Sequence, residues 1–331
     1  MPRIIRFHQL GGPEVLKLES EAPKEPGRGE VRLQVQAAGL NRAESLFMRG
    51  HYLEQPKLPT SGLGYEAAGT VQAVGPDVDR SWIGKTVATI PSFSMNQYSM
   101  LGEQVIAPVY ALGEYPAKLS PVEGAAIWMQ YMTAYGALIT IAHIAKGDFV
   151  VIPAASSSVG LAAIQIARAE GAISIATTRK SNKKAELLSL GADHVIATEE
   201  EDYVANVLQI TGGKGARVTF DPVAGPFLEK LAVAAAPGGI IFEYGLLSMQ
   251  PTPFPLTTAL GKGLTIRGYT LMHITQNPER LAAAKKYVFD HLADGSFHPV
   301  IAKVFPFEQT VQAFQYLESN AQVGKVVVSV P

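Results

Sequence analysis

The segment from Val150 to Gly160, VVIPAASSSVG, has the composition of a strand followed by a phosphate-binding loop and a helix. In a dinucleotide-binding fold, the pyrophosphate lies at the N-terminus of the helix that follows the first strand. Such a loop normally has three glycines, which allow a tight turn, close approach to the phosphate and close helix packing. Here the three positions are Ala155, Ser157 and Gly160, so only the third is glycine. Taken alone, the segment also fits an ordinary strand-to-helix turn.

The small size of the loop residues favours the phosphate-binding interpretation. Alanine and serine still allow the backbone to approach a ligand, and each serine hydroxyl can donate to a phosphate oxygen in addition to the backbone N–H. We therefore predict a phosphate loop in which hydroxyls supplement backbone amides. Its predicted cofactor-binding residues are Ala155, Ser156, Ser157, Ser158, Val159 and Gly160.

A second group of polar side chains follows the next expected strand, ISIATT. Sites that prefer NAD place a carboxylate there, about 20 residues past the loop, to bind the ribose 2′-hydroxyl. Residues 176–183, ATTRKSNK, contain no carboxylate, whereas Thr178, Arg179 and Lys183 can bind a 2′-phosphate. The alternative is a solvated basic helix start, but cations are unfavourable near a helix N-terminus. We therefore predict NADPH rather than NADH.

The composition limits the class of protein and its partners. A chain of 331 residues is long enough for two domains. The net charge of −1, without a basic block, gives no support for a nucleic-acid or membrane-surface partner. The lack of cysteine excludes disulfides, thiolate zinc sites and cysteine nucleophiles. No apolar run is long enough for a signal peptide or a membrane span, so we expect a cytoplasmic protein.

The pattern of elements changes twice along the chain. Residues 1–122 contain short strand-like runs separated by turns, at 31–40, 67–75 and 85–90. From 123 to 271, apolar strands alternate with helices, which predicts a parallel doubly wound sheet. The expected strands are 148–155, 173–178, 194–198, 216–223, 239–245 and 264–271, and the expected helices are 158–172, 183–192, 202–213 and 226–239.

After residue 272 we expect two more helices and two more strands. The helices are predicted at 278–295 and 310–320, and the strands at 302–307 and 324–330. The last strand, rich in β-branched valine, is expected to rejoin the sheet of the first domain.

Short motifs occur along the chain in a recognisable order: AGLNRAE (38–44), RGHY (49–52), GYEAAGTV (64–71), TAY (133–135), LGADHVI (190–196), FDPVAG (220–225) and GKVV (324–327). Together they resemble the medium-chain dehydrogenase/reductase superfamily, and within it the zinc-free quinone oxidoreductase branch, the zeta-crystallin-like reductases. The resemblance implies an α/β protein with a GroES-like β-rich catalytic domain and a Rossmann domain. We expect the catalytic domain to comprise 1–122 and 272–331, and the Rossmann dinucleotide-binding domain 123–271.

The resemblance also implies a site without a metal. Zinc-containing relatives carry a cysteine ligand in the loop that is Gly39–Arg42 here, and a histidine where this chain has Tyr65. Glu66 remains, but a single carboxylate is not a metal site. We therefore expect direct hydride transfer to an electrophilic carbon, with donors for the carbonyl oxygen and a source of a proton.

Several site residues are implied by the resemblance. Asn41 and Tyr52 are the predicted catalytic residues, although Asn41 also fits a turn and Tyr52 also fits a packing aromatic. Related enoyl-thioester reductases use a tyrosine near this position as proton donor. The further predicted cofactor-binding residues are Gln130, Thr133, Tyr244, Gly245 and Lys325.

Three functions remain open at this stage. The first is an NADPH-dependent reductase of a quinone or another conjugated carbonyl compound, such as an enone. The second is an enoyl-thioester reductase in which Tyr52 is a true acid, and the third is a non-catalytic NADPH-binding protein with a structural or regulatory role. The resemblance also implies a homodimer through the Rossmann-domain edge strand at 264–269, because such strands in this family often pair across a two-fold axis, which would cover the exposed edge.

Overall fold

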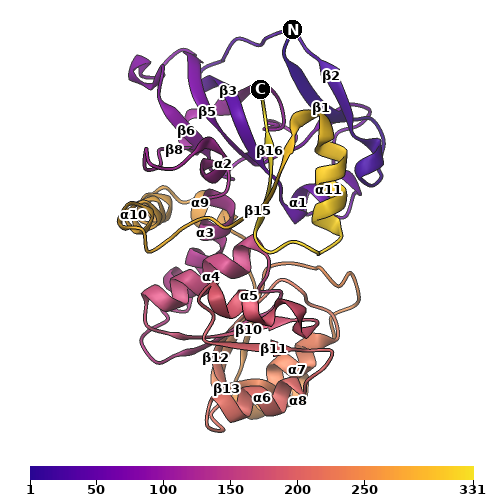
Figure 1. Cartoon of the computed structure of the whole chain (residues 1–331), viewed down its shortest axis with the longest axis vertical. Helices are drawn as coiled ribbons and strands as arrows, with labels where there is room; N and C mark the ends of the chain where they lie inside the picture. The colour runs from indigo at the N-terminus through magenta and orange to yellow at the C-terminus, as the bar shows by residue number, and fades with distance from the viewer. The chain divides into compact units, whose positions relative to one another are not determined.

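The chain divides into two compact units in the computed structural model, which describes residues 1–331 (Figure 1). Unit 1 comprises Met1–Met129, Leu281–Ala293 and His298–Pro331. Unit 2 comprises Gln130–Arg280 and Asp294–Phe297. The domain limits expected from the sequence, at residues 122 and 272, stay a prediction.

Unit 1 is built on two sheets. The larger contains β3 (Glu30–Gly39), β5 (Glu66–Val74), β6 (Thr86–Thr89), β7 (Gln104–Pro108), β8 (Leu112–Gly113), β15 (Ile301–Pro306) and β16 (Lys325–Ser329). The smaller contains β1 (Arg3–Phe7), β2 (Lys17–Ser20) and β4 (Ser61–Gly62). The strand order is β15-β16-β3-β5-β6-β8 with β7 also on β3, and all of these pairs are antiparallel except the parallel pair β15–β16.

Strand β3 forms the centre of the larger sheet. Its residues Val31, Leu33 and Val35 are fully buried and alternate with less buried positions, as expected for a strand with one face in the core. The C-terminal strand β16 pairs with β3, with Val328 opposite Ala38. The prediction that the last strand rejoins the N-terminal sheet is confirmed.

Unit 2 contains the alternating elements. Its strands are β9 (Phe149–Ile152), β10 (Ile173–Thr178), β11 (His194–Ala197), β12 (Ala216–Asp221), β13 (Ala235–Glu243) and β14 (Thr265–Gly268), and its helices include α4 (Ser158–Ala169), α5 (Lys184–Ser189), α6 (Tyr203–Ile210), α7 (Phe227–Ala234), α8 (Leu256–Lys262) and α9 (Met272–Thr275). All strands are parallel, in the order β11-β10-β9-β12-β13-β14. Helices α4 and α5 lie on one side of this sheet and α6, α7 and α8 on the other (Figure 1). The predicted doubly wound parallel sheet is confirmed, and its order reverses between β9 and β12.

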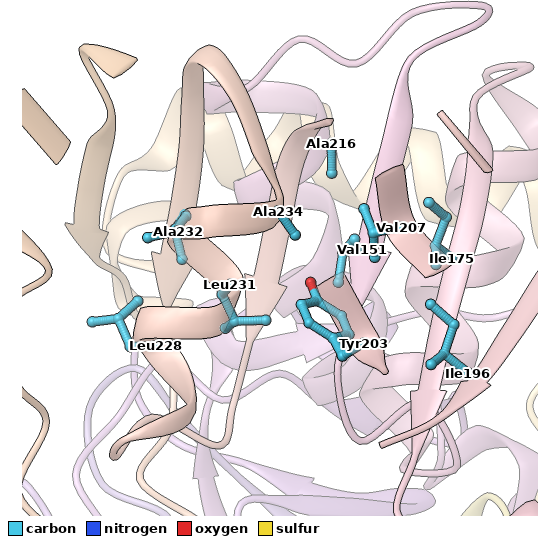
Figure 2. Packing of buried hydrophobic residues seen from close by; sticks show 11 residues of the cluster. Val151, Ile175, Ile196, Tyr203, Val207, Ala216, Leu228, Leu231, Ala232 and Ala234 are labelled. Carbon is cyan, nitrogen blue, oxygen red and sulfur yellow. The ribbon is translucent and has the colours of Figure 1, made fainter. Parts of the chain in front are cut away.

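The core beneath α6 and α7 joins these helices to the sheet. It is a cluster of Val151, Ile175, Ile196, Tyr203, Val207, Ala216, Leu228, Leu231, Ala232, Ala234 and Ile241. Figure 2 shows the ring of Tyr203 between the strand residues Val151 and Ile196 and the helix residue Leu231. Burying each large aliphatic side chain contributes about 1.5–3 kcal/mol, so the cluster fixes the sheet whose strand ends carry the loops described below.

The remaining helices are short, apart from one. They are α1 (Arg42–Met48), α2 (Pro121–Gly124), α3 (Trp128–Tyr135), α10 (Pro278–Asp294) and α11 (Thr310–Glu318), with 3-10 turns at Pro13–Val15, Arg80–Trp82, Val109–Ala111, Ser181–Lys183 and Phe307–Gln309 and a π-helical turn at Gly136–Ile141. No helix combines the length and the apolar character that crossing a membrane requires. The expected cytoplasmic location stays a prediction.

The expected helix over 226–239 was too long. Helix α7 ends at Ala234, and Ala235 already has extended backbone angles as the first residue of β13. Pro237 explains the difference, because proline lacks the N–H that a helix needs and disfavours helical geometry at Ala236 before it. The alanine-rich run has high helix propensity, but this constraint overrides it.

Candidate functional site

The loop between β9 and α4 contains the residues predicted to bind phosphate. Ala154 turns the chain with a φ of +48°, and the N–H of Ala155 donates to the carbonyl oxygen of Thr177 at 3.0 Å. Ser157 is the N-cap of α4, because its hydroxyl oxygen accepts from the N–H of Gly160 at 3.1 Å. The loop thus starts α4 at the point where the strand order reverses, which is where open α/β sheets bind their ligands.

Gly160 shows why one glycine of the motif is retained. A Cβ at this position would lie 2.6 Å from the Cα of Ala155 and 2.7 Å from its carbonyl oxygen. Helix α4 therefore packs against the loop more closely than any side chain would allow. This is the packing role that the third glycine has in dinucleotide-binding loops, and it supports the alignment made from the sequence.

Two cations follow β10, and one of them, Lys183, contacts this loop. The ammonium of Lys183 donates to the hydroxyl of Ser156 at 3.2 Å, and burial lowers the pKa of Lys183. Glu186 raises this pKa, whereas the neighbouring charge of Arg179 lowers it further. Since Arg179 is exposed and forms no ion pair, an anion beside Ser156 would relieve the repulsion between the two cations. Thr178 ends β10 next to them and is half-buried.

Gln130 and Thr133 lie on helix α3, and both are buried. The side-chain oxygen of Gln130 is buried and accepts no hydrogen bond. An unsatisfied buried amide oxygen is unfavourable, so it is suited to accept from a ligand. This fits the prediction that Gln130 contacts the cofactor, which stays a prediction.

Tyr244 and Gly245 follow the end of β13. The ring of Tyr244 stacks on Phe220 with 4.0 Å between centroids, and its hydroxyl is buried without a partner. A Cβ on Gly245 would lie 2.6 Å from the carbonyl oxygen of Pro222. Glycine is therefore required at position 245 by the nearby backbone of Pro222, whether or not a ligand binds. The predicted approach of a cofactor to this backbone stays a prediction.

A buried carboxyl pair lies at the ends of the adjacent strands β12 and β13. Asp221 and Glu243 are register partners, and Asp221 accepts from the N–H groups of Val223 and Ala224, each at 2.9 Å. No N–H or O–H group of the chain donates to either oxygen of Glu243, although both oxygens are buried. Burial raises the pKa of Glu243 to about 8, and the charge of Asp221 adds to the shift. Glu243 therefore carries a proton at neutral pH, which it can share with Asp221.

In unit 1, Asn41 begins helix α1 through a capping box. Its backbone N–H donates to the Oε2 of Glu44 at 2.7 Å, and its Nδ2 lies 3.2 Å from the Oε1 of Glu44. The same Nδ2 also lies 3.3 Å from the carbonyl oxygen of Gly39 and 3.3 Å from the Oε2 of Glu66. Since an amide nitrogen has two hydrogens, these acceptors already use the donor capacity of Asn41.

Lys325 neutralises this buried group of carboxylates. Its ammonium donates to the Oδ1 of Asn41 at 2.6 Å and forms a fully buried ion pair with the Oε2 of Glu66. The other oxygen of Glu66 accepts from the N–H of Met129 at 2.8 Å. Gly39 makes room for the lysine, because a Cβ there would lie 2.8 Å from the Cε of Lys325. The prediction that Lys325 binds cofactor stays a prediction, and its ammonium is engaged by Asn41 and Glu66 in this structure.

The network also includes the fully buried Glu44. Its carboxylate accepts from the N–H of Tyr65 at 3.1 Å as well as from Asn41. Burial raises the pKa of Glu44 to about 7, and the hydrogen bonds from Asn41 and Tyr65 and the charge of Lys325 moderate the shift. Glu44 thus ties the start of α1 to Tyr65, the residue immediately before β5.

Tyr52 lies in the loop after α1, next to Tyr65. Their ring centroids are 6.4 Å apart with an interplanar angle of 62°. Tyr65 is buried, whereas Tyr52 is partly exposed. Burial raises the pKa of Tyr52, and the neighbouring Tyr65 moderates the rise. The ring of Tyr52 therefore packs against a buried ring and keeps an exposed edge.

No three histidine or carboxylate side chains come close enough together to hold a metal ion. Glu44, Asp221 and Glu243 are not among the site residues predicted from the sequence. The capping-box spacing of Asn41 and Glu44 is a local signal that identifies Glu44, whereas Glu243 becomes visible only through the strand register.

Known proteins resemble this chain over nearly its whole length. The domain family described as "Alcohol dehydrogenase GroES-like domain" matches residues 27–140, and the family described as "Zinc-binding dehydrogenase" matches residues 158–286. Quinone oxidoreductase 1 of Escherichia coli (strain K12) is 32% identical over 323 residues, which cover 97% of each chain. The 2-haloacrylate reductase of a Burkholderia species is 30% identical over 330 residues, again covering 97% of each chain.

A solved structure has the same fold. The structure of Escherichia coli quinone oxidoreductase complexed with NADPH matches 99% of this chain and 99% of its own, with a TM-score of 0.90 and 30% identity. Both units, and the elements that position the residues described above, thus have counterparts in that structure.

Proposed function

Since this chain belongs to the zinc-free quinone oxidoreductase branch of the medium-chain dehydrogenase/reductase superfamily, we propose that it transfers a hydride from NADPH to a quinone or another conjugated carbonyl compound. The observation that carries this proposal is the full-length similarity to quinone oxidoreductases, one of which has been solved with NADPH. The relatives that align with nearly the whole chain are named as an oxidoreductase and a reductase. They support an enzyme rather than a non-catalytic NADPH-binding protein.

The residues of unit 2 fit NADPH. The first N–H groups of a helix have no intrahelical acceptor, so those of Ser158 and Val159 suit a pyrophosphate. Arg179 and Lys183 suit a 2′-phosphate, because both are cationic and Lys183 already contacts the loop at Ser156. We propose that these side chains select NADPH over NADH.

The residues of unit 1 fit the reduction of a conjugated carbonyl. NADPH, when bound, supplies the hydride. Negative charge then develops on the substrate, and a hydrogen-bond donor must stabilise it. Tyr52 has a partly exposed phenol, whereas the amide hydrogens of Asn41 face Glu44, Glu66 and Gly39. We therefore assign the donor role to Tyr52 and propose that Asn41 positions α1 and the loop that carries Tyr52.

A substrate panel with both cofactors tests this proposal. The purified full-length protein is mixed with NADPH or NADH and, in turn, with several quinones, enones and 2-haloacrylates, and the absorbance of the reduced nicotinamide is followed. We expect faster consumption of NADPH than of NADH with at least one of these classes. Tight NADPH binding without consumption of the cofactor by any of them would contradict the proposal.

A second candidate is the reduction of an enoyl thioester. It is favoured by the similarity to 2-haloacrylate reductase, whose name indicates reduction of a carbon–carbon double bond next to a carboxylate. Such a reaction needs a proton on carbon, whereas a hydroquinone takes its protons from water. Replacing Tyr52 with Phe should therefore lower the rate with an enoyl thioester roughly 100-fold and leave quinone reduction nearly unchanged.

We also propose a homodimer that pairs through β14. This strand is at the edge of the parallel sheet, and the nearby α8 exposes Leu256 and Leu260 at 58% and 74%. An exposed edge next to apolar side chains suits pairing with a second copy. Sedimentation at micromolar concentration should give twice the mass of the chain, and a monomer would contradict the proposal.

A further inference from the structure

Glu54 joins two loops of unit 1, at residues 49–60 and 91–99. Its Oε2 accepts from the hydroxyl of Ser94 at 2.6 Å, and its Oε1 accepts from the N–H of Met95 at 2.9 Å. Hydrogen bonds to an ionised carboxylate are stronger than those between neutral groups. One carboxylate of the first loop therefore holds both a side chain and the backbone of the second.

Asn96 joins the same two loops a second time. Its Nδ2 donates to the Oε2 of Glu54 at 3.3 Å and to the carbonyl oxygen of Gln55 at 2.9 Å, and its Oδ1 accepts from the N–H of Lys57 at 2.8 Å. Neither loop contains a helix or a strand, and no backbone–backbone hydrogen bond involves residues 52–58. The position of this segment therefore depends on its hydrogen bonds with the second loop.

Tyr52 lies in the first loop, two residues before Glu54. Both side chains are half-buried, whereas Leu53 between them is 75% exposed. The ring of Tyr52 packs on Tyr65, whose ring packs in turn on Phe93 of the second loop with 5.8 Å between centroids. A tilted ring contact tolerates more displacement than a hydrogen bond, which requires a narrow range of distances and angles. The hydrogen bonds of Glu54 therefore restrict the position of Tyr52 more than the ring contacts do.

We propose that Glu54 is a positioning residue: its carboxylate holds the segment 52–57 against Ser94 and Met95, and thereby fixes the phenol of Tyr52 where the substrate is protonated. The inference rests on the proposed function, in which Tyr52 is the hydrogen-bond donor, and it concerns the conjugated substrates that take a proton on carbon. Glu54 acts through the loop and not on the reacting atoms.

The step that depends on this position balances as a two-electron reduction. Both electrons come from NADPH, which is oxidised to NADP⁺, and the β-carbon of the enone gains a C–H bond. The O–H bond of Tyr52 then breaks, its proton forms a second C–H bond at the α-carbon, and water returns a proton to the phenolate. Because a displacement of roughly 1 Å can slow a reaction step up to about 100-fold, a loosened loop should slow this proton transfer.

The first test measures the position of Tyr52 without cofactor or substrate. The full-length protein is labelled with 3-fluorotyrosine, and the fluorine signal of Tyr52 is assigned by its loss in Tyr52→Phe. In Glu54→Ala we expect this signal to move toward the shift of free 3-fluorotyrosine, because the ring then samples several positions. The amide of Lys57, which donates to Asn96 and not to Glu54, should also exchange its hydrogen faster in this variant.

Glu30→Ala is the matched control. Glu30 is also half-buried and also accepts from one hydroxyl and one backbone N–H, those of Tyr98 and Gly27, each at 2.8 Å. Tyr98 belongs to the same second loop, but Glu30 forms no hydrogen bond with the loop that carries Tyr52. This variant should therefore leave the Tyr52 signal unchanged. An unchanged signal in Glu54→Ala, or an equal displacement in both variants, would overturn the inference.

The second test compares an enone with a quinone. Glu54→Ala should lower kcat for the enone by roughly tenfold, with a smaller change in KM, and should lower quinone reduction by at most about twofold, because a hydroquinone takes its protons from water. Glu54→Gln keeps one acceptor oxygen and should recover part of the loss. In the double variant with Tyr52→Phe, Glu54→Ala should lower kcat no further.

Equal losses with the enone and the quinone, or losses that add to those of Tyr52→Phe, would show a purely structural role and overturn the inference. If the unmutated protein reduces no enone, the proposed function fails for these substrates. The fluorine signal then still decides whether Glu54 holds Tyr52 in place.

Discussion

The two units bury their carboxylates in opposite ways. In unit 1, Glu66 forms an ion pair with Lys325 and accepts from Met129 through its other oxygen. In unit 2, Glu243 lies beside Asp221 without a cation, and no group of the chain donates to its oxygens. Burial of a charge requires compensation, which is a lysine in the first case and a proton in the second.

The difference has consequences for how each unit responds to change. A buried ion pair depends on the presence of both partners and little on pH near neutrality, whereas a shared proton is lost as the pH rises. We therefore expect the free energy of unfolding to be most sensitive to mutation at Lys325 in unit 1. In unit 2, we expect it to be most sensitive to pH, through the pair of Asp221 and Glu243.

The largest effect is expected from Lys325→Met. It removes the only cation bonded to Glu66 and leaves a buried, uncompensated carboxylate, so the free energy of unfolding should fall by about 3–5 kcal/mol. Lys286→Met is the control, because the ion pair of Lys286 with Asp290 is exposed and should contribute at most about 1 kcal/mol. Denaturant unfolding measures both. Similar losses for the two variants would mean that the buried pair is not the stabilising element of unit 1.

The next effect is a dependence of stability on pH in unit 2. The folded-state pKa of Glu243, about 8, lies above its ordinary value of 4.5. Its contribution to stability is therefore complete below pH 4.5 and is lost as the pH rises through 8. We expect the free energy of unfolding to fall by the order of a few kcal/mol over this range. Glu44, with a pKa of about 7, should add a dependence of the same sign over a narrower range.

The variant Glu243→Gln distinguishes the contribution of Glu243 to the pH dependence of stability from that of Glu44. The amide cannot ionise, and it can still donate to Asp221, so unfolding of this variant should depend less steeply on pH between 5 and 8. The measurement is a series of denaturant curves at different pH values. A variant with the same slope as the unmutated protein would show that Glu243 is not the group that titrates.

These clusters also mark the limit of what the sequence can predict. The strands of unit 2 follow from the alternation of apolar runs and helices, and the start of α1 follows from the spacing of Asn41 and Glu44. By contrast, Lys325 and Glu66 are 259 residues apart, and no local pattern links them. Their pairing depends on β16 joining β3 in one register, as the pairing of Asp221 with Glu243 depends on the register of β12 and β13. These pairings could not be predicted from residue type, because they depend on the register of strands that are far apart in the sequence.

The third prediction concerns Arg179, whose charge acts on Lys183, the lysine that contacts the loop at Ser156. Arg179→Ala should weaken NADPH binding by roughly 10- to 100-fold and leave NADH binding nearly unchanged, because one charge-assisted contact with the 2′-phosphate is removed. Arg168→Ala, on the exposed last turn of α4, is the control and should change neither affinity. Isothermal titration with both cofactors measures this. An equal loss for NADPH and NADH would place Arg179 away from the 2′-phosphate.

The smallest effect is expected from removing a helix N-cap hydroxyl in each unit. Ser157 caps α4 through a hydrogen bond from Gly160 at 3.1 Å, and Ser120 caps α2 through one from Glu123 at 3.3 Å. Ser157→Ala and Ser120→Ala should each lower the free energy of unfolding by about 1 kcal/mol. Only Ser157→Ala should also weaken NADPH binding, since the same cap orients the first N–H groups of α4 toward the predicted phosphate. Loss of stability at both sites with unchanged NADPH affinity would assign the serine loop to folding alone, and the phosphate would then have to be held elsewhere in unit 2.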